Sequence, residues 1–175
     1  LLEHAPLLRL VQTGAGYDNV DIEECTRRGI WVANAAGVNA AAVAEHVLAV
    51  LLCWSRCLIP LDRAMKAGQM HQPYSGSELA GRVLGIVGWG RIGRQVARRA
   101  AAFDMRLLVC SHRPLEPAEG VEQAELDRLL AEADAVTLHV PLDQGTRGLI
   151  GRRELGLMKS AALLINTSRG AVVDE

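Results

Sequence analysis

The chain has 175 residues, 50% of them hydrophobic and 22% charged, a composition typical of a globular domain and not of a disordered chain. Its 19 basic and 20 acidic residues leave a net charge of −1, so no bulk positive field would attract nucleic acid or an anionic membrane. Aromatic residues make up only 3%, which argues against a base-stacking platform. We therefore expect no nucleic-acid partner.

Neither a membrane span nor a disulfide framework is expected. The longest wholly apolar run, residues 47–54, is far shorter than the about 20 residues that span a bilayer. Cys53 and Cys57 are one helical turn apart and could form half a metal site, but inert buried thiols are the favoured interpretation. No secretory signal is visible in the sequence, which begins with Leu1 and not with Met. We expect a cytoplasmic protein with no membrane partner and no metal.

The first part of the chain alternates short apolar runs with amphipathic segments. It predicts a strand, a helix, a strand, a long helix, a short helix and a linker, over residues 7–12, 18–28, 30–33, 39–58, 60–67 and 69–81. Asn39 is the expected cap of the long helix, and Pro60 is expected to stop or kink it. Gly68 would close the short helix.

A regular strand–helix alternation follows the linker. Strands are predicted over residues 82–87, 106–110, 135–140 and 162–166, and helices over 91–102, 123–133 and 152–158. This order is typical of the mononucleotide-binding half of a doubly wound parallel sheet. The predicted fold class is therefore α/β, with a Rossmann-type sheet.

A glycine-rich turn joins the first of these strands to its helix. Gly88, Gly90 and Gly93 form the pattern G-x-G-x-x-G in the context that the motif requires. The first glycine permits a tight turn, the second lets backbone approach a pyrophosphate, and the third allows close packing of helix and strand. The N–H groups around Arg91 and Ile92 would then bind the dianion. The alternative is a glycine-rich turn without a ligand.

The segment after the next strand departs from the NAD version of the fingerprint. That version has an acidic residue there, whereas this chain has Ser111, His112 and Arg113 and no carboxylate before Glu116. A serine beside a cationic arginine favours the 2′-phosphate of NADP. We predict NADP in preference to NAD, the alternative being that Arg113 only faces solvent.

Arg169 follows the last predicted strand in the loop NTSRG. Ligands of open α/β sheets bind at the carboxyl ends of the strands, so this arginine could grip a carboxylate. From its position alone, Arg169 is equally consistent with an arginine on the surface that only faces solvent.

Five motifs together resemble the D-isomer-specific 2-hydroxyacid dehydrogenases, over nearly the whole chain. They are TGAGYDNVD, NAAGVNAAAVAEHVLA, GIVGWGRIG, ADAVTLHVPL and LMKSAALLINTSRGAVVDE, at residues 13–21, 34–49, 85–93, 133–142 and 157–175. The resemblance implies hydride transfer between NAD(P)H and a small 2-keto or 2-hydroxy acid, of the glyoxylate/hydroxypyruvate reductase type. It also implies a homodimer in the full-length protein.

The resemblance also assigns roles to individual residues. Arg169 matches the catalytic arginine that orients the substrate carboxylate. The backbone of Gly14, Ala15 and Gly16 matches the loop that binds this carboxylate, an anion-binding nest in physical terms. The cofactor-contacting positions implied by the family are Gly88, Gly90, Arg91, Ile92, Gly93, Ser111, His112, Arg113, Val140, Pro141, Thr167 and Ser168.

The resemblance further implies a piece of a longer enzyme. Residues 1–36 would be the end of a flavodoxin-like substrate domain, and residues 37–175 an incomplete cofactor domain. The family's acid/base histidine and its glutamate come from motifs beyond the NTSRG loop, so this piece alone is expected to be inactive. Two alternatives stay open: a non-catalytic, dinucleotide-sensing relative of transcriptional corepressors, and a dehydrogenase of another small anion such as formate or phosphite.

Overall fold

The structure, a computed structural model, describes residues 4–5, 7–69, 75–115 and 120–175. The chain divides into two compact units, Leu1–Ala40 and Ala41–Glu175, and each is described by itself. Part of the predicted linker and Glu116 lie outside the described residues.

The first unit is a single strand–helix–strand motif. Strands β1 (Leu10–Thr13) and β2 (Trp31–Asn34) pair in parallel, and helix α1 (Ile22–Arg27) connects them. The predicted helix began earlier, at residue 18, but the Asp21 side chain accepts the backbone N–H of Glu24 and so caps α1 at its observed start.

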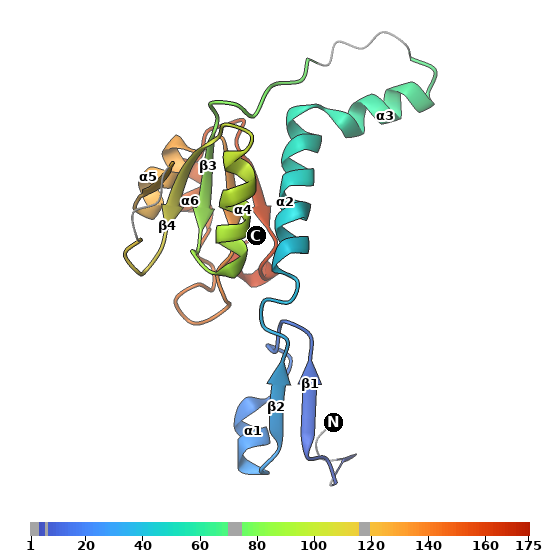
Figure 1. The fold of residues 1–175 in the computed structure, drawn as a ribbon, viewed down its shortest axis with the longest axis vertical. Coiled ribbons are helices and arrows are strands. Elements are labelled where there is room, and N and C mark those ends of the chain that lie inside the picture. Colours follow the sequence, from blue (N-terminus) through green and yellow to red (C-terminus); the bar gives the residue numbers. More distant parts are fainter. Residues whose placement is uncertain (1–3, 6, 70–74, 116–119) are drawn as a thin grey trace. The chain divides into compact units, whose positions relative to one another are not determined.

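The second unit contains a five-stranded, wholly parallel sheet (Figure 1). The strand order is β5-β4-β3-β6-β7, with bounds Val121–Gln123, Arg106–Cys110, Val83–Val87, Ala135–Leu138 and Leu163–Asn166. The connecting helices are α4 (Arg91–Ala101), α5 (Leu126–Glu132) and α6 (Arg152–Leu157), and α2 (Ala40–Ser55) precedes the sheet. The chain builds outward from β3 to β5, then returns to place β6 on the other side of β3. This order confirms the predicted doubly wound sheet.

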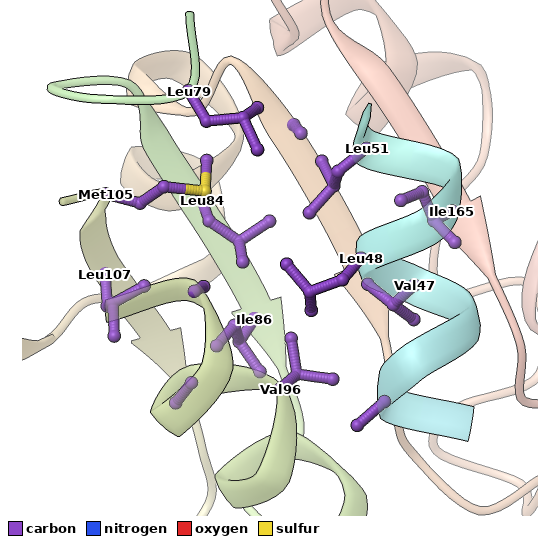
Figure 2. Close-up of a cluster of buried hydrophobic side chains, with 14 of the residues drawn as sticks. Val47, Leu48, Leu51, Leu79, Leu84, Ile86, Val96, Met105, Leu107 and Ile165 are labelled. Atoms are coloured by element: carbon purple, nitrogen blue, oxygen red, sulfur yellow. The ribbon is translucent and has the colours of Figure 1, made fainter. Parts of the chain in front are cut away.

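Every residue of β3 is buried, because helices cover both faces of the sheet. Figure 2 shows Val47, Leu48 and Leu51 of α2 directed toward Leu84 and Ile86 of β3. The alternate β3 residues face a second cluster, whose members from the other elements include Leu108, Leu129, Leu130, Val136, Leu138, Ile150 and Val172. A continuous apolar strand between two apolar layers is what a parallel sheet with helices on both faces requires.

The long helix predicted to end at Pro60 ends earlier. Helix α2 stops at Ser55, and α3 (Leu58–Lys66) begins after Cys57, whose φ of +52° lies in the left-handed region. Pro60 lies inside the first turn of α3, where a helix does not need the backbone N–H that proline lacks. The proline is therefore not the breakpoint. Among the described residues, no single helix is long and apolar enough to cross a membrane.

Strand β5 was not predicted. Its sequence, Val-Glu-Gln, has a single apolar residue, and Gln123 was assigned to the following helix. The observed α5 begins only at Leu126. An edge strand with one covered side needs little apolar sequence, so the pattern carried no signal for it.

Candidate functional site

The glycine-rich turn occupies the carboxyl end of β3, next to the end of β6. Gly88 has a φ of +101°, and its N–H donates to the Cys110 carbonyl at 2.9 Å. A Cβ on Gly88 would lie 2.4 Å from the carbonyl oxygen of His139, and a Cβ on Gly93 would lie 2.3 Å from the carbonyl oxygen of Gly88. Both glycines are thus required by packing within the protein.

Gly90 is different, because a Cβ there would meet no protein atom within 4 Å. Gly90 is the N-cap of α4, with a φ of −87° that any residue adopts. The first turn of α4, at Arg91 and Ile92, begins at this open space, and the N-terminus of a helix directs N–H groups and a positive partial charge outward. The open space at Gly90 therefore lies beside donors suited to an anion.

The loop after β4 contains the three residues predicted to read the ribose. Ser111 is partly buried, whereas His112 and Arg113 are exposed. The Ser111 hydroxyl accepts the backbone N–H of Arg113 at 3.3 Å. Gln123, at the end of β5, also bonds this loop, a contact that the sequence analysis did not anticipate.

His139 links the ends of β6 and β7. Its backbone N–H donates to Val87 at 2.7 Å, and its ring nitrogens lie 3.0 Å from the Thr137 hydroxyl and 3.4 Å from the Thr167 hydroxyl. Burial lowers the pKa of His139 to about 4, so the ring is neutral at pH 7 and pairs one donor and one acceptor with the two hydroxyls. Val140 and Pro141 follow directly on the same strand end. The sequence carries no local sign of this link, because Thr167 lies in the loop after a different strand, β7.

The loop after β7 contains Arg169 and is held by Asn166. The Asn166 side chain donates to the Arg169 carbonyl at 2.7 Å and accepts the backbone N–H and the hydroxyl of Ser168 at 3.0 and 2.7 Å. The Arg169 guanidinium donates to the Ser168 carbonyl at 2.8 Å, and the Arg169 side chain is partly buried. Asn166 was predicted only as a strand end, and the structure adds its role in shaping the loop.

The predicted carboxylate-binding loop lies in the first unit, after β1. The carbonyl of Gly14 accepts the N–H of Ala35 at 3.0 Å, and the carbonyl of Ala15 accepts the side-chain amide of Asn34 at 3.1 Å. Residues at the end of β2 therefore define the path of residues 14–16. A Cβ on Gly14 would meet nothing within 4 Å.

The second unit thus gathers four loops at one edge. They follow β3, β4, β6 and β7, and in a parallel sheet all carboxyl ends meet at the same edge. The chain reverses its direction of growth between β3 and β6, which is the point where open α/β sheets form their ligand crevice. Within the described residues, no group of three or more His, Cys, Asp or Glu side chains could hold a metal ion.

Comparison with known proteins identifies the family. Residues 48–175 match the family model described as D-isomer specific 2-hydroxyacid dehydrogenase, NAD binding domain. A glyoxylate reductase from Thermococcus litoralis is 44% identical over 186 residues, covering 99% of this chain and 56% of the relative.

Solved structures agree with the sequence match. D-lactate dehydrogenase from Aquifex aeolicus, complexed with NAD and lactic acid, has a TM-score of 0.91 at 35% identity, over 99% of this chain and 54% of that one. An acyclic imino acid reductase (Bsp5) in complex with NADPH and D-Arg has a TM-score of 0.86 at 32% identity, over 95% of this chain and 55% of that one. The chain spans about half the length of these relatives. It belongs to the D-isomer-specific 2-hydroxyacid dehydrogenase family.

Proposed function

We propose that this chain carries the dinucleotide-binding part of an oxidoreductase that acts on a small 2-keto or 2-hydroxy acid, of the glyoxylate/hydroxypyruvate reductase type. The observation that carries the proposal is the meeting of four loops at the carboxyl edge of the sheet, around a glycine-rich turn. In this proposal, residues 37–175 belong to the cofactor domain and residues 1–36 to the end of the substrate domain. The glyoxylate reductase relative supports the substrate class.

The turn after β3 fits a dinucleotide pyrophosphate. Gly90 leaves open space beside the N-terminus of α4, an 11-residue helix whose dipole favours an anion. Gly88 and Gly93 bring the turn against His139 and the helix against the turn, so the open side is the ligand side. Val140 and Pro141 would border the same crevice. A bound nicotinamide dinucleotide supplies the hydride, and the chain's residues position it.

The loop after β4 supports a preference for NADP over NAD. A carboxylate at the ribose position would repel a 2′-phosphate, whereas Ser111 offers a hydroxyl and Arg113 a permanent cation. His112 adds a third polar group to this exposed loop. The relatives include proteins solved with NAD and with NADPH, so both cofactors occur on this fold.

Arg169 is proposed to bind the substrate carboxylate and polarise the 2-keto oxygen. Its guanidinium is planar and always charged, which suits bidentate binding of a carboxylate. The hydrogen bonds that Asn166 makes to the loop hold Arg169 in place before any ligand arrives, and this lowers the cost of ordering it on binding. The backbone of residues 14–16 would supply further donors, and Thr167 and Ser168 would lie near the nicotinamide ribose.

Titration calorimetry of this chain with NADPH and NADH tests the cofactor proposal. Arg113→Gln is expected to weaken NADPH about tenfold and NADH less than twofold, because only the 2′-phosphate loses a charge-assisted partner. Arg63→Gln, which removes an exposed arginine of α3, is the matched control and should change neither affinity. Absence of binding to either dinucleotide would refute the proposal, and tighter binding of NADH would refute the NADP preference.

The reaction itself is tested on the intact protein. Arg169→Gln is expected to lower the reduction of glyoxylate and hydroxypyruvate by at least about a hundredfold while leaving dinucleotide affinity within about twofold. An intact wild-type protein that binds NADPH but reduces neither acid would favour the non-catalytic, sensing alternative. The isolated 175-residue chain is proposed to bind dinucleotide without turnover.

We also propose that the intact protein is a homodimer. Helix α3 exposes three large apolar side chains, Leu58, Ile59 and Met65, which are 47, 56 and 60% exposed. Such side chains favour burial in an interface. Sedimentation of the intact protein should give a dimer, and replacing Ile59 and Met65 with serine should shift it toward the monomer. A wild-type monomer at micromolar concentration would contradict this.

A further inference from the structure

Gln123 is a polar residue on the edge strand β5, and the function proposed above gives it no role. It ends β5 and lies opposite Val109 in the register with β4. Its backbone belongs to the strand, and its side chain reaches the loop that follows β4. The neighbouring Glu122 carboxylate pairs with Arg128 at 2.7 Å, so it is engaged elsewhere.

The Gln123 amide makes three hydrogen bonds to this loop, all to backbone atoms. Its Oε1 accepts the N–H of Leu115 at 3.0 Å, and its Nε2 donates to the carbonyls of Ser111 and Arg113 at 3.2 and 3.3 Å. Both amide hydrogens are therefore used, and two carbonyl partners define which end of the side chain is the nitrogen. One side chain holds every second residue from 111 to 115.

These contacts fall on the segment proposed to recognise the 2′-phosphate. The segment is exposed at His112 and Arg113, and Leu115 at its end packs against the core. The hydrogen bonds described within it are the Ser111–Arg113 bond and the three bonds from Gln123. Recognition of a phosphate needs donors held at a defined place before the ligand arrives. Without Gln123, the loop would keep Arg113 but lose the three hydrogen bonds that tie its backbone to β5.

We infer that Gln123 is a positioning residue for cofactor choice, which acts by holding the 111–115 loop in the shape that binds a 2′-phosphorylated ribose. Its effect passes through Arg113 and does not require contact with the dinucleotide. The inference rests on the proposed dinucleotide binding and NADP preference.

A double-mutant cycle between Gln123 and Arg113 tests this inference, with NADPH and NADH titrated into the 175-residue chain. Gln123→Leu is expected to weaken NADPH about five- to tenfold and NADH less than twofold. In the Arg113→Gln background, Gln123→Leu should change NADPH affinity less than twofold, because its target is already gone. Gln123→Glu keeps the length and one acceptor but loses both donors, so it should act in the same direction and more strongly on NADPH.

Amide hydrogen exchange of the ligand-free chain provides a readout that does not depend on binding. The Leu115 N–H should exchange faster in Gln123→Leu than in the wild type, while amides in β3 should be unchanged. Equal loss of NADPH affinity in both Arg113 backgrounds, equal loss for both dinucleotides, or unchanged Leu115 exchange would overturn the inference and leave the proposed function intact. A wild type that binds neither dinucleotide, or prefers NADH, would reject the corresponding proposal and this inference with it.

Discussion

Gly88 and Gly90 stand two residues apart, yet the structure predicts opposite consequences for replacing them with alanine. In Gly88→Ala, the new methyl group meets the His139 carbonyl oxygen at 2.4 Å, and the φ of +101° is unfavourable for any residue with a Cβ. A left-handed backbone costs about 1–2 kcal/mol. Forcing an extra methyl into a packed site costs about a further 1–3 kcal/mol. The expected loss of stability is therefore about 2–5 kcal/mol.

Gly90→Ala is the matched control for folding and the test for binding. Its φ of −87° is allowed, and no protein atom lies within 4 Å of the new Cβ, so stability should change by less than about 1 kcal/mol. If a pyrophosphate approaches this open side, dinucleotide affinity should fall while stability is kept.

Urea unfolding followed by circular dichroism measures the first effect, and calorimetric titration with NADPH measures the second. The reasoning would be refuted by a Gly88→Ala chain within about 0.5 kcal/mol of the wild type. It would also be refuted by a Gly90→Ala chain that is as destabilised as Gly88→Ala, since the two sites would then be equally crowded.

Three further predictions concern the stability of the second unit. Burial lowers the pKa of His139 to about 4, so the unfolded chain takes up a proton at a higher pH than the folded chain, and stability should fall as the pH drops from about 6.5 toward 4. Urea unfolding at pH 7 and pH 4.5 should show a smaller loss of stability in His139→Gln than in the wild type. An equal loss in both would contradict this. The Asp134 carboxylate accepts the first N–H of β3 at 2.8 Å and the Lys159 ammonium at 2.8 Å. Asp134→Ala should therefore lose about 1–3 kcal/mol in urea unfolding and Lys159→Ala less than about 1 kcal/mol, whereas equal losses would mean that the ion pair alone matters. A Cβ on Gly85 would lie 2.4 Å from Cδ2 of Leu129, so Gly85→Ala should lower the free energy of unfolding by about 1–3 kcal/mol. This loss should be smaller in a Leu129→Ala background. An unchanged loss there would show that the clash lies elsewhere.

The sequence predicted the central strands well because they are buried on both faces. The strand over residues 106–110 was predicted with its observed bounds, and the glycine pattern placed the turn and the start of α4 at Arg91. These features leave a local signal: a continuous apolar run, or glycines at defined spacing. Edge strand β5 has neither and was missed.

The links between loops could not be read from the sequence. His139, Gln123 and Asn166 each hold a segment of the site, but His139 and Gln123 act on loops that follow a different strand, and no spacing rule connects those partners. Only Asn166 acts locally, on the loop that directly follows it. A polar residue at the end of a parallel strand is the one signal common to Gln123 and Asn166.

The placement of β3 between β4 and β6 has a consequence for synthesis on the ribosome. The two sides of β3 are completed at different times, because Val83 is joined to Asp134, 51 residues further along the chain. At about 5–20 residues per second, roughly 3 to 10 s separate the emergence of these partners. During that interval the sheet consists of β5, β4 and β3, and the side of β3 that later pairs with β6 is an open apolar edge. Another nascent chain could pair with this edge. Chaperone demand for this protein should therefore peak before residues 135–138 emerge.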